Sequence, residues 1–299
     1  MVLTDQALHP LHQTLLDLGI CRAGSLEPFH DRVRDRDDVE VVQCRESGIV
    51  MLATLDHIND RYYDDKLHSE LAELGDRDRV AMAHDEDTVR RATQWGHAIT
   101  NRRWLDIGTG SGAILDRLGG RATEVAAVEP QGEFRSLLSE RGYQVFRDVR
   151  DAPNDSFDLV TLFHVFEHMT SPLDDLLSIR EVLAPGGRVV IEVPHARDFL
   201  LSFLGVESFR SFTLWSEHLL LHTRDSLRRF LEAAGFDDVT IRGFQRYPLA
   251  NHLHWLAEGR PGGHDRWAML RDHDLDAAYG RKLADIDATD TLIAEAICR

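Results

Sequence analysis

A glycine-rich turn is the segment of this sequence with the clearest chemical meaning. It reads Leu105-Asp106-Ile107-Gly108-Thr109-Gly110-Ser111-Gly112 and lies between a strand-like run and a helix-like run. Glycines allow a tight turn there and leave backbone amides open to a ligand. Because several nucleotide cofactors use similar turns, the turn alone does not identify its ligand. It supplies four candidate cofactor-binding residues: Asp106, Gly108, Gly110 and Gly112.

Acidic residues near the ends of three successive strands narrow the choice of cofactor. Asp106 precedes the first glycine by two residues, where its carboxylate would repel a pyrophosphate but attract the ammonium and sulfonium groups of S-adenosylmethionine. Glu129 follows the second strand and can accept both ribose hydroxyls. Asp148 follows the third strand and can meet the adenine amino group. Together these acids predict S-adenosylmethionine as the cofactor.

Taken in order, these residues resemble the class I S-adenosylmethionine-dependent methyltransferases. The resemblance covers about residues 95–240 and implies a Rossmann-like α/β fold, with a doubly wound, seven-stranded and mostly parallel sheet. It also implies that the last strand is antiparallel and inserts between strands five and six. His164, which follows the fourth strand, is expected to contact the cofactor. The other matching segments are Phe157–Val160, Val165–His168 and Leu183–Gly187.

Glu217 and His218 are the candidate catalytic residues. Methyl transfer is an in-line displacement, so the enzyme positions two reactants and manages one proton. A histidine that is neutral near physiological pH suits removal of that proton. Residues 217–235 also resemble a segment of the sugar C-methyltransferases of deoxysugar pathways, in which a Glu-His pair before a helix serves acid–base chemistry. The alternative is that His218 only orders its loop.

No metal site is predicted. Where the sugar C-methyltransferases carry Cys-x-x-Cys in a zinc-binding module, this chain has Cys44-Arg45-Glu46-Ser47, so zinc is not expected. Cys21, Cys44 and Cys298 lie far apart without metal-ligand spacing and fit reduced thiols of a cytoplasmic protein.

A second polar and aromatic cluster lies at residues 245–256. Tyr247 or Trp255 can stack on a ring-shaped methyl acceptor there, and Arg246 can pair with an anionic group. Alternatively, this segment is a rigid structural loop or forms a contact in a homodimer. The sequence leaves the oligomeric state open.

The elements that must position these residues alternate between strands and amphipathic helices, as in a parallel α/β sheet. We expect a small attachment over residues 1–85, with a helix from Leu8 to Leu18 and a hairpin of Val39–Val42 and Gly48–Leu52. The cofactor-binding domain is expected over residues 86–299, with insertions at about 199–225 and 245–275. Its expected strands are Arg103–Ile107, Glu124–Val128, Gln144–Phe146, Phe157–Phe163, Arg188–Val193, Val239–Arg242 and Thr291–Ile297, and its expected helices include Ala113–Leu118, one that ends at Leu183, and Ser226–Ala234.

Charge and hydropathy limit the partners. The chain has 299 residues, with 34 basic and 51 acidic side chains and a formal charge of −17, which disfavours nucleic acid as a partner. No apolar stretch reaches the roughly 20 residues needed to span a bilayer. Asp5 stands where a signal peptide would carry basic residues. We therefore expect a cytoplasmic protein without membrane or nucleic-acid partners.

These observations predict a methyltransferase that acts on a small-molecule acceptor. A sugar or glycoconjugate precursor is the preferred acceptor class. The alternatives are O- or N-methylation of another small metabolite such as a quinone-like or lipid precursor, a nicotinamide-dependent oxidoreductase that uses the same glycine turn, and a non-catalytic binding protein.

Overall fold

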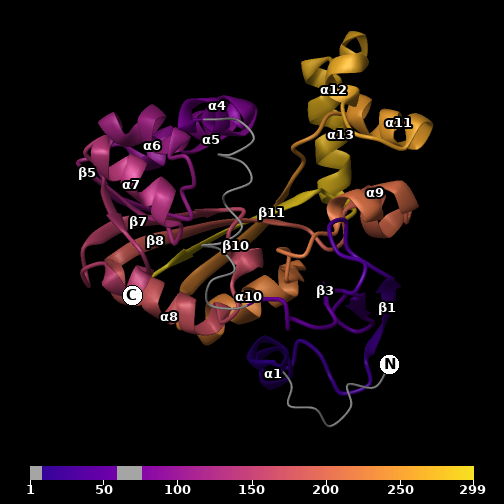
Figure 1. The fold of residues 1–299 in the computed structure, drawn as a ribbon, viewed down its shortest axis with the longest axis horizontal. Helices are drawn as coiled ribbons and strands as arrows, with labels where there is room; N and C mark the ends of the chain where they lie inside the picture. Colours follow the sequence, from indigo (N-terminus) through magenta and orange to yellow (C-terminus); the bar gives the residue numbers. More distant parts are fainter. Residues whose placement is uncertain (1–8, 59–75) are drawn as a thin grey trace.

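A seven-stranded sheet forms the centre of the molecule in the computed structural model, which describes residues 9–58 and 76–299 (Figure 1). The strand order is β10-β11-β8-β7-β4-β5-β6, and β11 runs antiparallel to both of its neighbours while the other pairs are parallel. This is the predicted doubly wound fold, with the last strand inserted as expected. The strands are β4 Arg103–Ile107, β5 Glu124–Val128, β6 Gln144–Phe146, β7 Phe157–Phe163, β8 Leu183–Pro194, β10 Asp237–Phe244 and β11 Thr291–Ile297.

Helices cover both faces of this sheet because each strand directs alternate apolar side chains to opposite sides. Trp104 of β4 packs in one cluster with side chains of α5 (Asp85–Ile99), α6 (Ala113–Leu118) and α7 (Gly132–Glu140). Its neighbour Leu105 packs in the other cluster, with α8 (Pro172–Val182) and α10 (Arg224–Ala233). A short helix, α4 (Arg77–Ala83), precedes α5.

Several predicted boundaries differ from the structure by a few residues; β10, for example, extends beyond the predicted Val239–Arg242 at both ends. Two of the differences have clear local reasons. Helix α10 begins two residues before the predicted start at Ser226, because the Thr223 side chain accepts a hydrogen bond from the Ser226 backbone N–H and caps the first turn. Strand β8 begins at Leu183 rather than Arg188, because Leu183 already pairs with Phe157 ahead of the glycine turn, after which the register shifts.

The N-terminal attachment forms a second, four-stranded antiparallel sheet. Its order is β1-β2-β3-β9, from β1 (Leu26–His30), β2 (Val41–Cys44), β3 (Val50–Leu52) and β9 (Leu220–Leu221). The predicted hairpin corresponds to β2 and β3, and the predicted first helix is α1 (Pro10–Asp17). The sequence analysis missed β1 and β9. Leu8, the predicted start of the first helix, and residues 1–5, which include the Asp5 of the signal-peptide argument, lie outside the described residues.

This small sheet and the large sheet share one hydrophobic core, which includes Leu11, Ile49, Leu105 and Phe230. Because β9 comes from the first insertion, the attachment is tied to the large domain by strand pairing as well as by apolar contact. Cys21, Cys44 and Cys298 are buried and free, and Cys44 Sγ lies 3.2 Å from Ser25 Oγ.

The two insertions are mainly helical and project beyond one edge of the large sheet (Figure 1). The first contains a π-helical turn, η4 (Phe199–Phe203), and α9 (Glu207–Thr213). The second contains α11 (Leu249–Glu258), α12 (Gly263–Arg266), η5 (Ala268–Leu270) and α13 (His273–Asp285). Within residues 9–58 and 76–299, none of the helices has the length and apolar character needed to cross a membrane.

Phe230 provides a test of the shared core. Its side chain is fully buried, with its ring 5.9 Å from that of Phe166 and 5.7 Å from that of His222. Phe230→Ala should lower the free energy of unfolding by about 3–5 kcal/mol, because it removes buried apolar surface and leaves a cavity. Urea denaturation measures the change. Met269→Ala is the control, since Met269 is 80% exposed; an equal loss in the two variants would contradict this packing.

Candidate functional site

A cavity of about 460 Å³ opens at the carboxyl ends of β4, β5, β6 and β7. Ligands of doubly wound sheets bind at this edge. Five of the predicted cofactor-binding residues line the cavity: Gly108 and Gly110 in the turn after β4, Glu129 after β5, Asp148 after β6 and His164 after β7. The fold therefore brings together residues that lie far apart in the sequence.

The three glycines of the turn have different roles, although all have left-handed φ angles of 68°, 54° and 70°. A Cβ atom on Gly108 would lie 2.4 Å from Val165, and one on Gly112 would lie 2.4 Å from Leu138. These two positions need glycine for close packing as well as for their backbone angles. Apart from its chain neighbours, no atom of residues 9–58 and 76–299 lies within 4 Å of the corresponding point at Gly110. Gly110 thus leaves space for a ligand, and Gly112 instead caps α6.

Glu129 links the end of β5 to the glycine turn. Its carboxylate accepts hydrogen bonds from the backbone N–H groups of Gly110, at 2.7 Å, and Gln131, at 3.0 Å. Only 2% of the residue is exposed, and this burial raises the pKa of Glu129 to about 7. Its charge in the free protein therefore changes near neutral pH, and its position in the cavity wall suits the predicted contact with ribose hydroxyls.

Asp106 lies behind the turn rather than in the cavity wall. It is almost fully buried and accepts a hydrogen bond of 2.5 Å from the Thr161 hydroxyl, which in turn accepts one from the Trp104 indole. Burial raises the pKa of Asp106 to about 6. In this arrangement Asp106 orders the end of β4, and its attraction for a cationic ligand stays a prediction.

Asp148 stabilises the local structure after β6. It caps a short 3-10 helix, η2 (Val149–Asp151), by accepting a hydrogen bond from the Arg150 backbone N–H at 2.9 Å, and it also pairs with the Arg150 guanidinium. Its contact with adenine stays a prediction, although its position in the cavity wall is the one predicted.

A second cavity, of about 590 Å³, lies on the other side of His164. His164 lines both cavities, so they meet at this residue. The second cavity is built from the end of β7, from both insertions and from α5, and His218 and Arg246 belong to its wall. Its aromatic walls are Phe163, Phe209, Phe212, Trp215, Tyr247 and Trp255.

His164 is held tightly at this junction. It has a left-handed φ of 58°, and its backbone N–H donates to the Glu192 carbonyl at 2.8 Å. Nδ1 lies 3.1 Å from Glu167 Oε1, while Nε2 lies 3.0 Å from Arg246 Nη1 and 3.3 Å from Glu192 Oε1. Burial and Arg246 oppose protonation, but the two glutamates outweigh them and raise the pKa of His164. Both ring nitrogens have partners, which favours a positioning role.

The predicted catalytic pair is divided between the two cavities. Glu217 lines the first cavity and His218 lines the second. Burial, followed by repulsion from His168, lowers the pKa of His218 to about 3, so His218 is neutral at physiological pH.

The carboxylate that approaches His218 is Glu167. One oxygen of Glu167 and one nitrogen each of His168 and His218 lie within 4.8 Å of one another. Glu167 is fully buried; burial opposes its ionisation, yet the hydrogen bond from His164 and the charges of the nearby histidines hold its pKa at about 2. The sequence analysis quoted Glu167 within a matching segment but did not assign it a role. The prediction that no metal is bound stays a prediction.

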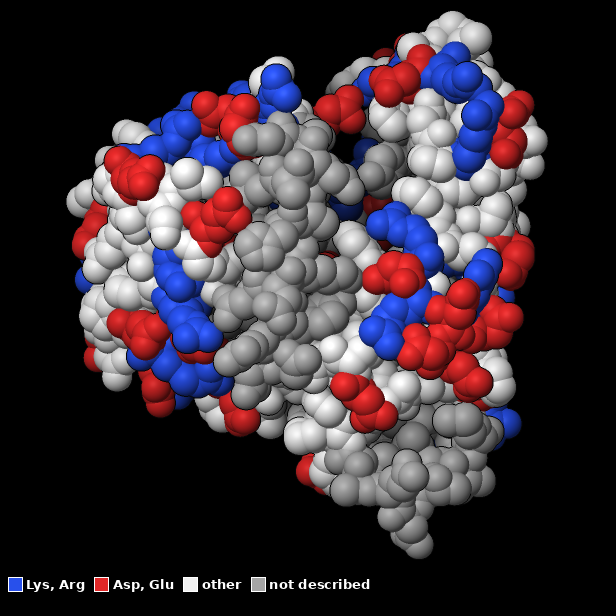
Figure 2. Space-filling view, viewed as in Figure 1, with Lys and Arg blue, Asp and Glu red and all other residues white. Residues whose placement is uncertain are grey.

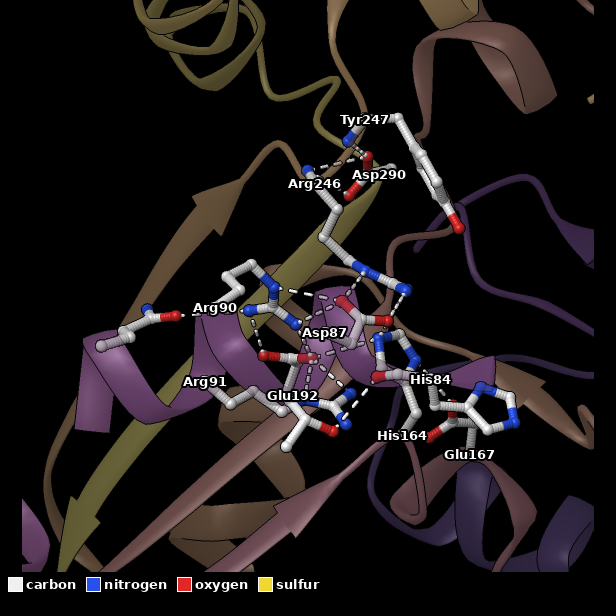
Figure 3. Close-up of polar contacts among 12 residues, drawn as sticks. His84, Asp87, Arg90, Arg91, His164, Glu167, Glu192, Arg246, Tyr247 and Asp290 are labelled. Carbon is white, nitrogen blue, oxygen red and sulfur yellow. Dashed lines mark hydrogen bonds and ion pairs between the residues drawn. The ribbon is translucent and has the colours of Figure 1, made fainter. Parts of the chain in front are cut away.

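A network of charged residues supports the wall between the cavities (Figure 3). Glu192 on β8 is fully buried and accepts hydrogen bonds from Arg90, at 2.7 and 2.9 Å, and from Arg91, at 2.8 Å. Arg246 reaches from the second insertion to both carboxylate oxygens of Asp87 on α5. The anion that Arg246 pairs with in this structure is therefore an internal carboxylate. Sequence reasoning missed Asp87, Arg90, Arg91 and Glu192 because no motif connects them.

Comparison with known proteins agrees with this geometry. A family described as "Methyltransferase domain" matches residues 55–241. A ubiquinone biosynthesis O-methyltransferase of Aeromonas salmonicida is 29% identical over 169 residues, which cover 52% of this chain and 71% of that protein. A tRNA U34 carboxymethyltransferase of Ectopseudomonas mendocina is 29% identical over 152 residues, 47% of each chain. The solved structure of a possible histamine N-methyltransferase from Thermotoga maritima shares the fold, with a TM-score of 0.52 at 15% identity over 82% of this chain and all of that one.

Glu129 generates a prediction about cofactor affinity. If ionised Glu129 is the form that accepts the ribose hydroxyls, S-adenosylhomocysteine should bind more weakly as the pH falls through the Glu129 pKa of about 7. The loss should approach about tenfold per pH unit below that value. Isothermal titration calorimetry across the pH range measures the dissociation constant.

Two variants sharpen this test. Glu129→Gln should bind weakly at every pH and lose most of the pH dependence. Asp148→Asn should keep the pH dependence, because Asp148 already pairs with Arg150. An affinity that does not change with pH in the unaltered protein would contradict the assignment of Glu129.

Proposed function

Because this chain belongs to the methyltransferase-domain family and is an S-adenosylmethionine-dependent enzyme of class I, we propose that it methylates a hydroxyl oxygen on a small aromatic ring. One observation carries the proposal: a cavity of about 590 Å³ with aromatic walls adjoins the cofactor cavity at His164. Flat rings stack well on such walls, and a shared boundary lets the acceptor oxygen approach the methyl group. The relatives named for O-methylation in ubiquinone biosynthesis support the same acceptor class.

An aromatic acceptor has more support than the sugar or glycoconjugate precursor preferred from the sequence. A nucleotide-linked sugar carries phosphate groups, which need free cationic side chains. Arg91 and Arg246, the two arginines in the described part of the wall of the second cavity, both pair with carboxylates of the chain.

A small molecule also has more support than a tRNA acceptor. The tRNA-modifying relative matches less than half of this chain, and the formal charge of −17 opposes a polyphosphate partner. On the face shown in Figure 2, basic and acidic side chains are interspersed, and a hollow opens between the sheet and the helical insertion. The cytoplasmic location and the absence of nucleic-acid and membrane partners stay predictions.

We assign the proton transfer to His218. In the reaction the acceptor oxygen attacks the methyl carbon, the bond from that carbon to sulfur breaks, and its electron pair stays on sulfur to give S-adenosylhomocysteine. The hydroxyl proton must leave the acceptor oxygen. His218 lines the second cavity in its neutral form, and because its pKa is held at about 3, the transfer requires that the imidazolium be stabilised when the proton arrives. Ionised Glu167, close to His218, would stabilise the resulting imidazolium.

A screen of acceptors tests the proposed function directly. The protein should transfer the labelled methyl group of S-adenosylmethionine to members of a panel of phenols and catechols, and mass spectrometry should detect their O-methyl products. Nucleotide sugars serve as the comparison panel. Methylation of nucleotide sugars without methylation of any phenol or catechol would contradict the proposal.

His218→Gln tests the proton acceptor. This variant should lower kcat by about 10²–10⁴-fold, the usual contribution of general acid–base catalysis, and leave the affinity for S-adenosylhomocysteine unchanged. Steady-state kinetics with an acceptor from the screen, together with calorimetry, separates the two effects. His273→Gln is the matched control, because its side chain is 96% exposed. An unaltered kcat in His218→Gln would rule out His218 as the base.

A further inference from the structure

We infer that the second cavity selects uncharged aromatic acceptors over acceptors with a carboxylate or phosphate group, and that Asp87 determines this selectivity. The inference rests on the proposed function and specifies its substrate class. It follows from the two arginines in the described part of the cavity wall, each of which already pairs with a carboxylate of the chain.

Each guanidinium group in the described part of the wall already directs one pair of N–H groups, Nε and Nη2, to an internal carboxylate. Arg246 uses Nε and Nη2 on the two oxygens of Asp87, and its third nitrogen, Nη1, lies 3.0 Å from His164 Nε2. Arg91 directs Nε and Nη2 to Glu192, at 3.1 and 2.8 Å. Arginine binds anions most strongly through two parallel N–H groups. In the described part of the wall, Arg91 and Arg246 therefore both use their parallel Nε and Nη2 donors on internal carboxylates.

Arg90, directly behind the wall, is committed in the same way. It donates to Asp87 at 3.0 Å and to both oxygens of Glu192. It cannot turn to an incoming anion without giving up a contact to a fully buried carboxylate.

Carboxylates in the same wall oppose further negative charge. Asp290 accepts hydrogen bonds from the Arg246 backbone N–H at 3.0 Å and the Gln245 amide at 2.7 Å, and Asp198 accepts them from the first N–H groups of η4. Burial, followed by repulsion from Asp290, already raises the pKa of Asp198 to about 7, so a further negative charge near these two residues is unfavourable. In the described part of the wall, an anionic acceptor would meet these groups while both guanidinium groups already pair with carboxylates of the chain, and such a mismatch of charge is how a site rejects a wrong ligand.

The remaining wall suits an uncharged ring. The Phe209 and Trp255 rings pack edge to face with centroids 5.1 Å apart, and the Trp215 ring is fixed on its outer side by the Arg34 guanidinium, 4.5 Å from its centroid. These are large aromatic surfaces held in defined positions, and they offer stacking contacts that do not depend on acceptor charge.

Asp87 is the residue whose change should release the selectivity. Asp87→Asn keeps the size of the side chain but removes the charge that holds Arg246. The Arg246 guanidinium would then be able to pair with an acceptor carboxylate. Asp85→Asn is the matched control, because Asp85 is on the same helix but pairs with Arg117 and does not line the second cavity.

Two catechols that differ only in charge provide the test: protocatechuate, which carries a carboxylate, and protocatechuyl alcohol, which does not. Binding of each is measured at neutral pH by calorimetry with S-adenosylhomocysteine present, and methyl transfer is measured separately by mass spectrometry. The unaltered protein and Asp85→Asn should bind the alcohol at least about tenfold more tightly. Asp87→Asn should shift this ratio at least about tenfold toward protocatechuate.

Each outcome decides between the inference and the proposed function. If the binding ratio is as expected but neither catechol is methylated, the proposed function fails and the selectivity stands. Equal or tighter binding of protocatechuate by the unaltered protein overturns the inference, and that measurement needs no variant. A ratio that Asp87→Asn leaves unchanged, in a variant that still binds S-adenosylhomocysteine, overturns the role of Asp87. Failure of both catechols to bind overturns both proposals.

Discussion

Neutralisation of the Glu192 carboxylate is the interaction on which the functional part of the molecule depends. Glu192 is fully buried near the end of β8, where an unpaired charge would be very costly. Arg90 and Arg91 from α5 and His164 from the end of β7 surround it and hold its pKa well below the usual range for a glutamate, although burial acts in the opposite direction. One charge thus connects a helix and two central strands at the point where the cavities meet, and removal of any partner would leave part of it unpaired.

The second insertion is tied to the same point through Arg246. This residue pairs with Asp87 and contacts His164, so the wall of the second cavity and the end of β7 are fixed relative to each other. Positioning of this kind is the main contribution that an enzyme makes to an in-line methyl transfer, since the cofactor brings the reactive group. In the proposed function, His164 is a fixed boundary between the two reactants, and His218 is the residue of the second cavity to which we assign proton transfer.

The central sheet was predictable because local patterns determine it. Strands β4, β5, β6, β7 and β11 have the predicted bounds, since buried runs end at turn residues. That residues after these strands gather around the first cavity was predictable for the same reason: Gly108 and Gly110 follow β4 and Glu129 follows β5, and these adjacent parallel strands end at one edge of the sheet. By contrast, β9 escaped prediction because two residues pair only in the context of the small sheet.

The second cavity was less predictable because its contacts join distant segments of the chain. The sequence suggested Glu217 as the partner of His218 because the two are adjacent, but it did not indicate that Glu167, from the loop after β7, also lies close to that ring. Likewise, Arg246 reads as a free cation in the sequence, and only the fold brings Asp87 to it. Spacing along the chain identifies residues at strand ends, but it does not identify which charges cancel.

The central claim is that the two cavities form one reaction site divided by His164. A crystal structure of the protein with S-adenosylhomocysteine tests it most directly. The account predicts the adenosine in the glycine-turn cavity, its ribose hydroxyls at Glu129, and the thioether sulfur beside His164, facing the aromatic cavity. Electron density for the ligand outside the glycine-turn cavity, or a sulfur atom directed away from the aromatic cavity, would contradict the account.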